Sequence, residues 1–337
     1  MIAKNPARKR LAGLLALGLL LCGLVPLSTM VGSHAIAPST VWQAILAFDP
    51  SNSDHLLVVH LRIPRTLLAI VVGMGLGVAG AIMQALTRNP LADPGLFGVN
   101  AGAAAAVATA IAFFGTGSVV AYMGYGLCGA ALAGLAIYVL GDLRHEASPE
   151  RVVLAGAALS VVLLSLTQII LINSDEQVFN QFRHWTVGSL QGRGYAVLGP
   201  VSLLTLFGLG IALLLARSLD AMALGQDLSR ALGTNPAFVW SAASVAIIVL
   251  AGAATAAAGP IIFIGLTAPH LARFITGPSH RWLLPYAMAI AATLMVAADI
   301  LGRVIVPPGE VGVGIMVALM GGPFFVALVR RRRVARL

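Results

Sequence analysis

Ten apolar stretches of about membrane-spanning length dominate this sequence, and they restrict the chain to a protein that lies within a lipid bilayer. Gly, Pro and charged residues separate the stretches, and one helical crossing needs about 20 apolar residues. The chain is 59% hydrophobic and 10% charged, whereas soluble domains carry about 25% charged residues. We therefore predict an all-α, polytopic membrane protein in which residues 1–337 form a single transmembrane domain.

The eighth stretch differs from the others because it is too short to cross the bilayer upright. Gly259 and Pro260 break the chain before it. We expect a kinked or partial helix that other helices shield, since backbone at that depth needs internal hydrogen-bond partners. The predicted spans are 11–31, 66–86, 96–114, 118–140, 151–172, 196–216, 237–257, 261–273, 283–303 and 312–329.

The basic residues predict the orientation of the spans. Ten crossings place both ends of the chain on one side, and nine of the 21 Lys and Arg residues lie in the two terminal segments. Sixteen basic residues fall on that side, and five fall on the other: Arg62, Arg65, Arg183, Arg193 and Arg303. Because cytoplasmic loops are enriched in Lys and Arg, we predict that both termini are cytoplasmic.

The N-terminal segment also has features of a signal peptide. Basic residues precede an apolar run, and an A-x-A sequence follows at 35–37. However, the run extends to about Val31, and Pro38 follows the would-be cleavage site. We therefore interpret the segment as a spanning helix.

Polar and small residues inside the spans indicate how the helices pack. Small residues recur every fourth position over 126–134, which allows helix backbones to approach closely. Gln84 and Gln168 are interpreted as interhelical hydrogen-bond partners. Asp299 and Arg303 are four residues apart, so they share a helix face and are expected to form an ion pair.

Several kinds of chemistry are excluded by residue type. The only lysines are Lys4 and Lys9, so no G-x-x-x-x-G-K-[ST] nucleotide loop can occur later in the chain. If ATP drives this protein, another subunit must hydrolyse it. Cys22 and Cys128 lie in apolar runs without Cys or His at ligand spacing, so the sequence indicates no metal site and no disulfide framework.

Two other functional classes were weighed. An ion-coupled secondary carrier would need an intramembrane ion or proton site, and no series of Asp, Glu or His runs through the predicted spans. An intramembrane hydrolase would need a nucleophile and a base that face one cavity. Ser241 and His270 lie on different segments without supporting spacing.

The polar segment at about 217–236, between the sixth and seventh spans, predicts a short cytoplasmic helix. Gly225 and Gly233 bracket it, while Asp227 in its first turn and Arg230 in its last turn complement the helix dipole. Its apolar stripe consists of Leu228, Ala231 and Leu232. The pattern alone leaves open whether this stripe packs on the parent bundle or on a cytoplasmic partner.

Two features on the opposite side also have alternative interpretations. Arg62 and Arg65 flank Pro64 at a helix start, where they either anchor lipid headgroups or pair with an acidic extracytoplasmic partner. The loop 174–195 predicts a short helix at the membrane interface, or alternatively the lining of a substrate vestibule with Arg183 or Arg193. The apolar side of that helix would contain Val178, Phe179, Phe182 and Trp185.

Four sequence motifs resemble the permease family of bacterial iron-siderophore and vitamin B12 ABC importers. They are QALTRNPLADPGLFGVNAGA at 84–103, GPIIFIGLTAPHLAR at 259–273, HRWLLP at 280–285 and ADILGR at 298–303. The resemblance extends from about Arg62 to the C-terminus. The first motif, together with GRVIVP at 302–307, is most similar to ferric enterobactin-type permeases.

This resemblance implies an ABC type II importer permease that is not itself an enzyme. The expected partners are a second permease subunit, which need not be identical, two cytoplasmic ATPases that bind ATP and Mg²⁺, and a periplasmic substrate-binding protein. This chain would bind no cofactor, metal or nucleic acid. It would lie in the bacterial inner membrane and import a ferric siderophore, with vitamin B12 or haem as the alternative cargo.

The resemblance also implies roles for individual residues. Arg62, Arg65 and Arg303 match positions that pair with acidic residues of the binding protein, and Asn89 and Leu91 match a cytoplasmic gate. A second gate is poorly matched at 148–150 and stays unassigned. The residues that match the segment seated on the ATPase are Leu219, Leu224, Gly225, Asp227, Leu228, Arg230, Leu232 and Gly233.

Overall fold

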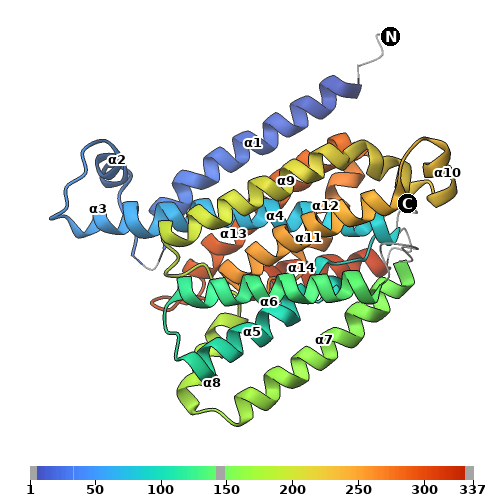
Figure 1. Ribbon diagram of the computed structural model, residues 1–337. Coiled ribbons are helices and arrows are strands. Elements are labelled where there is room, and N and C mark those ends of the chain that lie inside the picture. The colour runs from blue at the N-terminus through green and yellow to red at the C-terminus, as the bar shows by residue number, and fades with distance from the viewer. Residues whose placement is uncertain (1–5, 33, 142–148, 331–337) are drawn as a thin grey trace.

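The computed structural model describes residues 6–32, 34–141 and 149–330, and these residues form an all-helical bundle (Figure 1). Several residues of the charge and gate predictions lie outside this part of the chain, namely Lys4, Arg144, Ser148, Arg331, Arg332, Arg333 and Arg336. The polytopic all-α fold predicted from the apolar runs is confirmed.

Each predicted span coincides with a helix. Seven helices of the described residues are long and apolar enough to cross a membrane, and two further apolar helices are shorter. The eighth span is a helix of 13 residues, as its length and the preceding Gly-Pro break predicted. These helices are α1 (Pro6–Met30), α4 (Ile63–Thr87), α5 (Val99–Phe114), α6 (Val119–Leu140), α7 (Pro149–Ile172), α9 (Tyr195–Ala223), α11 (Pro236–Ala258), α12 (Ile264–Thr276), α13 (His280–Val304) and α14 (Val313–Arg330).

Short helices connect the spans at both ends of the bundle. The two that the sequence predicted are present as α8 (Glu176–Thr186) and α10 (Gln226–Ala231). The others were not predicted: α2 (Pro38–Leu46), α3 (Ser53–Leu57), the π-helical η1 (Val58–Arg62) and the 3₁₀-helical η2 (Pro94–Phe97).

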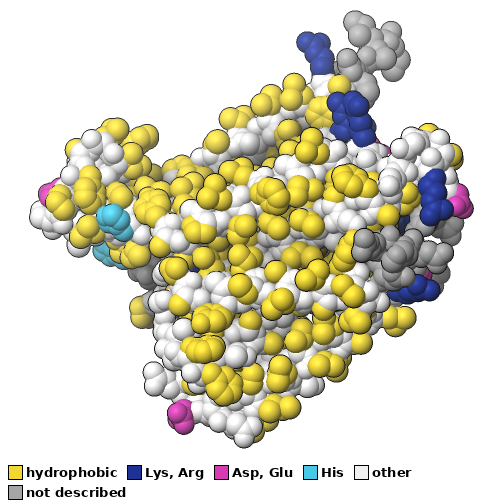
Figure 2. Space-filling view, viewed as in Figure 1, with side chains coloured by type: hydrophobic (Ala, Val, Ile, Leu, Met, Phe, Trp, Pro, Cys, Tyr) yellow, Lys and Arg dark blue, Asp and Glu magenta, His cyan; other side chains and the backbone are white. Residues whose placement is uncertain are grey.

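Helix α4 forms the centre of the bundle. It packs against α9, α11, α12 and α13, and most of its surface is buried. In contrast, α1 and α7 lie at opposite edges and expose most of their surface (Figure 1). Figure 2 shows apolar side chains over the middle of the visible face, with Lys and Arg gathered at the end that carries α10. This distribution matches a bundle whose mid-section faces lipid.

Glycines allow the helices to approach at backbone distance. A Cβ on Gly80 of α4 would overlap the carbonyl of Gly265 at the start of α12, and one on Gly102 of α5 would overlap the carbonyl of Gly129 on α6. In the series predicted from the sequence, Gly134 packs on Ile248 of α11. Such contacts replace the hydrophobic effect between helices, which lipid does not supply.

We expect Gly80→Ala to lower the free energy of unfolding by about 1–3 kcal/mol, because the new methyl group must displace backbone. Gly210→Ala is the matched control, since a Cβ on Gly210 of α9 would meet nothing within 4 Å. That control should be neutral or slightly stabilising, because Ala is a better helix former than Gly. Unfolding titrations of both variants in the same detergent compare the two effects. Equal stability would contradict the tight packing.

Candidate functional site

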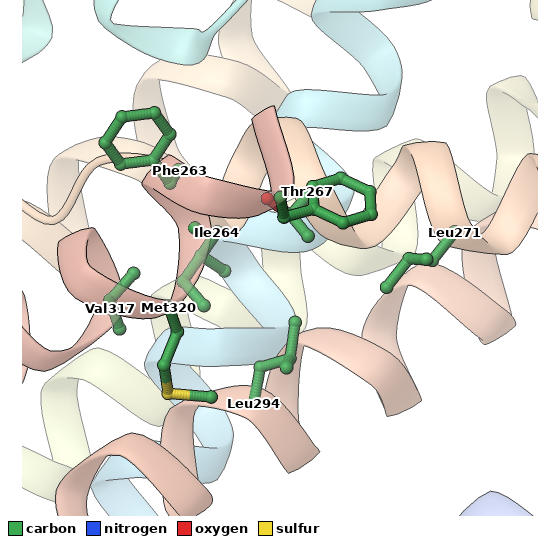
Figure 3. A pocket seen from close by; sticks show the side chains of 9 residues that line it. Phe263, Ile264, Thr267, Leu271, Leu294, Val317 and Met320 are labelled. Atoms are coloured by element: carbon green, nitrogen blue, oxygen red, sulfur yellow. The ribbon is translucent and has the colours of Figure 1, made fainter. Parts of the chain in front are cut away.

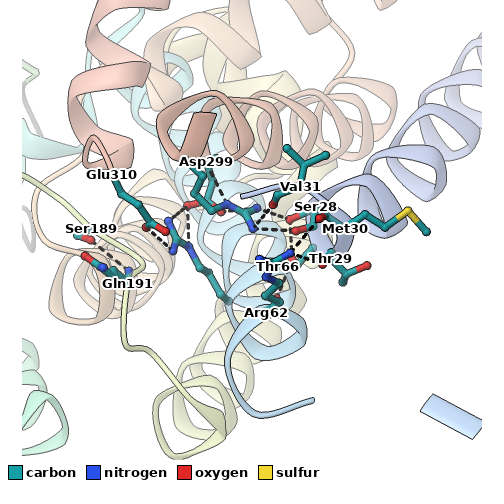
Figure 4. A network of polar contacts seen from close by, with 12 residues as sticks. Ser28, Thr29, Met30, Val31, Arg62, Thr66, Ser189, Gln191, Asp299 and Glu310 are labelled. Atoms are coloured by element: carbon teal, nitrogen blue, oxygen red, sulfur yellow. Dashed lines mark hydrogen bonds and ion pairs between the residues drawn. The ribbon is translucent and has the colours of Figure 1, made fainter. Parts of the chain in front are cut away.

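A cluster of buried charges lies at the end of the bundle opposite α10 (Figure 1), and Figure 4 shows its polar contacts. Arg62 ends η1, Arg65 follows Pro64 in the first turn of α4, and Arg303 lies in the last turn of α13. The cluster thus contains the three arginines that the sequence assigned to docking. We call these three residues, together with Asp299 and Glu310, the arginine cluster.

Arg65 joins the two acidic residues of the cluster. Its Nε and Nη2 donate to Asp299 Oδ1 at 3.0 and 2.9 Å, and its Nη1 donates to Glu310 Oε2 at 2.7 Å. Arg303 faces the other oxygen of Asp299 at 2.9 Å, which confirms the predicted ion pair across four residues. Asp299 and Arg303 are 1% and 2% exposed. Such a buried ion pair is costly to break, because either partner alone would be an uncompensated charge.

Arg303 also binds the C-terminal end of α1. Its Nη1 donates to the carbonyls of Ser28 and Val31 at 2.7 and 3.2 Å, and its Nη2 donates to the Ser28 hydroxyl at 2.6 Å. Helix C-termini leave their last carbonyls unsatisfied and carry partial negative charge. The Arg303 guanidinium donates hydrogen bonds to these carbonyls and places a positive charge beside the partial negative charge of the helix end.

Arg62 completes the capping of α1. Its Nη1 donates to the carbonyls of Thr29 and Met30 at 2.8 and 3.0 Å, and its Nη2 donates to the carbonyl of His34. Nearby, the hydroxyls of Ser28 and Thr66 share a 2.7 Å hydrogen bond between α1 and α4. The cluster therefore attaches α1, which is otherwise peripheral, to the core of the bundle.

A cleft of about 330 Å³ opens onto the cluster. Its lining includes the three arginines and Glu310, together with Leu57 and Leu61. Three guanidinium groups and two carboxylates leave a local excess of one positive charge. The cleft can therefore accept an acidic group, although all three arginines already have internal partners. Sequence spacing predicted the Asp299–Arg303 pair but missed Glu310, Ser28 and Thr66.

At the opposite end, α10 has the predicted form of a short exposed helix. Gly225 and Gly233 adopt positive φ values of 113° and 80° at its two ends, a conformation that favours glycine. Leu224, Leu228 and Leu232 are 60%, 49% and 61% exposed. The apolar stripe therefore does not pack on the parent bundle, and its contact with a cytoplasmic partner stays a prediction.

Other contacts fix the position of α10. Asp227 and Arg230 are 4.0 Å apart as an exposed pair, while the buried Ser229 hydroxyl contacts Met222 Sδ at 3.4 Å. Leu219 is fully buried within α9. It was predicted among the ATPase-contacting residues, but its side chain faces the bundle because it belongs to the spanning helix and not to the short one.

A second polar contact joins the base of this segment to α13. Asp220 Oδ1, near the end of α9, accepts from the His280 backbone N–H at 2.7 Å and lies 2.6 Å from His280 Nδ1. The neighbouring Ser279 hydroxyl donates to Asp220 Oδ2 at 3.4 Å. These bonds connect the chain just before α10 to the N-terminus of α13.

The predicted turn after α4 is present. Arg88 has φ of 48° and ends the helix, and Asn89 Oδ1 accepts from the Leu91 N–H at 3.0 Å. Asp93 then caps η2 by accepting from the Gly95 N–H at 2.8 Å, and burial raises the pKa of its carboxyl group. Asn89 is exposed and Leu91 is half-buried. The structure thus confirms the turn that the two prolines require, whereas the gate itself is a proposal.

Of the predicted apolar side of helix α8, Phe182 and Trp185 are buried and Val178 is half-buried, whereas Phe179 is exposed. Its following loop is attached to α11 through the Ser189 N–H, which donates to the Ala258 carbonyl at 2.7 Å. Arg193 is 5% exposed and donates to the Tyr122 hydroxyl at 3.0 Å. It therefore anchors this loop to α6 and does not line an open vestibule.

The remaining candidates do not form a catalytic pair. Ser241 shares a 2.8 Å hydrogen bond with Tyr138 of α6, whereas the His270 ring meets Phe324 of α14 edge-on at 6.1 Å. Gln84 accepts from Arg273 Nη1 at 3.1 Å, as expected for an interhelical partner, whereas Gln168 is exposed on α7. Among the described residues, no group of His, Cys, Asp and Glu could hold a metal ion.

An apolar cavity of about 140 Å³ lies between α12, α13 and α14 (Figure 3). Phe263, Ile264, Leu294 and Met320 are among its lining residues. Ligand pockets commonly enclose about 300–1,000 Å³. This cavity is therefore too small and too apolar to hold a large polar solute.

Comparison with known proteins gives consistent similarities over nearly the whole chain. A model of the FecCD transport family matches residues 19–331. The ferric enterobactin transport system permease protein FepD of Escherichia coli K12 is 43% identical over 316 residues, or 93% of each protein. The hemin transport system permease protein HmuU of Yersinia pestis is 38% identical over 332 residues, covering 96% of this chain and 97% of that protein.

A solved structure has a similar fold. It is an inward-facing conformation of a metal-chelate type ABC transporter, with a TM-score of 0.83 and 28% sequence identity. The match covers 94% of this chain and 98% of that chain.

Proposed function

The chain belongs to the FecCD transport family, as a non-catalytic permease subunit of an ABC importer for iron siderophores or haem, and we propose that its cargo is a ferric catecholate siderophore related to ferric enterobactin. The observation that carries this proposal is the 43% identity to the ferric enterobactin permease. The hemin permease is 38% identical, so haem is the second candidate. Membership of a family of ABC permeases argues against an ion-coupled carrier.

The family implies a complex with an ATPase and a binding protein. We assign the α10 end of the bundle to the cytoplasm of a bacterial inner-membrane protein. The basic start of α1 and Arg330 at the end of α14 support this orientation, because basic residues favour the cytoplasmic side. The arginine cluster then faces the periplasm, where the binding protein would dock, and α10 faces the two ATPase subunits.

A second permease subunit would complete the path for the cargo. The cavity between α12 and α14 is too small for a siderophore, and α7 exposes apolar side chains along its length. An exposed apolar face of this size at the edge of the bundle fits a helix–helix interface as well as lipid.

Transport would proceed by alternating access, in which ATP and cargo bind two states of the complex with different affinities. Closure of the ATPase dimer would move α10, and the Asp220–His280 contact offers a route from its base to α13. The selectivity of import would then come mainly from the binding protein.

The cargo assignment is tested with the complex reconstituted in liposomes. Uptake of iron-labelled ferric enterobactin, a ferric hydroxamate, ferric citrate and haemin is measured in turn, each with its own binding protein and internal ATP. We expect ATP-dependent uptake to be fastest for ferric enterobactin. Faster uptake of haemin would replace the proposed cargo by the second candidate.

Asn89 and Leu91 are predicted to narrow the path at the cytoplasmic surface without lasting contact with the cargo. A short apolar side chain can close a pore by narrowing and drying it. Single cysteines at positions 89 and 91, in a Cys22→Ala/Cys128→Ala background, should crosslink across the permease interface in a nucleotide-dependent manner. Absence of crosslinking in every nucleotide state of an active complex would remove the gate but leave the importer assignment intact.

A further inference from the structure

Helices α2 and α3 extend outward from the start of α4, beyond the other helices of the bundle (Figure 1). Residues 53–87 form one continuous helical run of 35 residues, which is about 52 Å long at 1.5 Å per residue. The part from Arg65 to Arg88 spans about 35 Å and is enough to cross a hydrocarbon core of about 30 Å. With Arg65 at the edge of the hydrocarbon core, Ser53 lies about 18 Å further out along the helix axis, which exceeds the thickness of the headgroup layer of about 5–8 Å. Figure 1 shows α2 and α3 beyond the other helices at this end of the bundle.

Residues 36–57, which include α2 and α3, pack around a small core of their own, and we call this segment the projection. Ile36, Val41 and Ala44 form a small buried core with Val58 of η1, separate from the core of the main bundle. The Asn52 side chain caps α3 by accepting from the Asp54 N–H at 2.9 Å. The projection therefore presents a defined surface.

That surface is strongly apolar. Trp42, Ile45 and Leu46 occupy one face of α2 at helical spacing and are 61%, 52% and 78% exposed. Phe48 and Leu56 are also exposed, at 43% and 40%. Contiguous exposed apolar groups beyond the bilayer mark an interaction site.

Charge and distance argue against lipid as the group that covers this surface. Residues 34–61 contain no Lys or Arg, whereas surface helices that bind anionic lipid are rich in both. The acidic groups of the projection are the exposed Asp49 and the half-buried Asp54, which lies 3.3 Å from His34 Nε2. The Ser51 hydroxyl and backbone N–H donate to Asp49 and lower the pKa of its carboxyl group.

The projection is continuous with the arginine cluster. Leu57 at its end, and Leu61 one turn later, line the same cleft as Arg62, Arg65 and Glu310. A protein whose acidic group enters that cleft would contact Leu57, at the base of the projection. Buried aromatic and aliphatic anchors beside charged contacts are the usual source of binding energy in such interfaces.

We propose that the projection is a second docking surface for the extracytoplasmic binding protein, and that it contacts an apolar patch beside the acidic group that enters the arginine cluster. This inference rests on the proposed function. It assigns the apolar contact to Trp42 and Leu46 and the salt-dependent contact to Arg65.

Binding is measured with the complex in nanodiscs and the binding protein that supports uptake by the wild-type complex. Trp42→Ser/Leu46→Ser should raise the Kd about tenfold or more, because two exposed anchors are lost. The loss should be similar at low and high salt, since apolar contacts are not screened. Arg65→Glu should weaken binding most at low salt. Because Arg65 also bonds Asp299 and Glu310, the unfolding midpoint of this variant is measured in parallel, so that lost affinity is separated from lost stability. Phe274→Ser is the matched control, because Phe274 on α12 is 88% exposed at the cytoplasmic end, and its Kd should be unchanged.

A spin label provides a second measurement that does not depend on affinity. It is attached at Trp42→Cys in the Cys22→Ala/Cys128→Ala background. We expect a water-soluble relaxation agent to reach this label and the binding protein to protect it. Relaxation by a lipid-bound agent instead, without protection, would assign the surface to lipid and overturn the proposal.

These measurements distinguish a failure of the docking proposal from a failure of the proposed function. If the double variant binds like wild type while Arg65→Glu weakens binding, the projection is not a docking surface and the proposed function stands. If the wild-type complex supports uptake with none of the binding proteins, both inferences fall together.

Discussion

Replacing Arg303 with Glu is expected to destabilise the transmembrane domain by about 3–5 kcal/mol, the cost of breaking a buried ion pair by changing one partner. Arg303 is 2% exposed and faces Asp299 at 2.9 Å. A Glu at this position would place two carboxylates together and remove the donors to the Ser28 and Val31 carbonyls. The midpoint of thermal unfolding in detergent should fall well below that of the wild type.

Two matched variants separate this effect from docking. Arg183→Glu reverses an exposed arginine on the same side and should change stability by less than about 0.5 kcal/mol. Asp299→Asn/Arg303→Met removes both charges at similar volume and should be much milder than Arg303→Glu. A stable Arg303→Glu protein that has lost only its affinity for the binding protein would instead make Arg303 a direct docking residue.

The spanning helices could be predicted from the sequence, because a chain within lipid can adopt few other secondary structures. A bilayer requires every backbone group to be bonded within its own helix, so apolar length and Gly-Pro breaks predict where helices lie. The same reasoning gave the short α12. The two glycines and the charges at 227 and 230 predicted the helix α10, but not whether its apolar stripe is exposed. It missed α2 and α3, because nine and five residues of mixed polarity carry little periodic signal.

The partners of the arginine cluster could not be predicted, because they are distant in the sequence. Arg303 bonds Ser28 from 275 positions away, and Arg65 bonds Glu310 from 245 positions away. Only the Asp299–Arg303 pair lies within one helix, and only that pair was predicted. The contact of Arg193 could not be predicted for the same reason, since its partner Tyr122 is 71 positions away.

Introducing Asp at Leu228 or Leu232 is expected to abolish ATP-driven uptake while the permease stays folded. Both side chains are about half exposed or more, so a charge there costs the isolated protein little. Burial of a Leu in an interface contributes about 1.5–3 kcal/mol, and an Asp would remove that contribution and add an unpaired carboxylate. Uptake by the reconstituted complex should fall at least about tenfold, whereas the unfolding midpoint should not change.

Leu219→Asp is the informative contrast, because it changes the same residue type only nine positions before Leu228. Leu219 is 0% exposed, so its replacement buries an unpaired charge and should unfold the protein. Phe274→Asp, at an 88% exposed site outside α10, should leave both uptake and stability unchanged. If Leu228→Asp and Leu232→Asp retain full uptake, α10 does not contact the ATPase. If they unfold like Leu219→Asp, the exposed stripe belongs to the bundle after all.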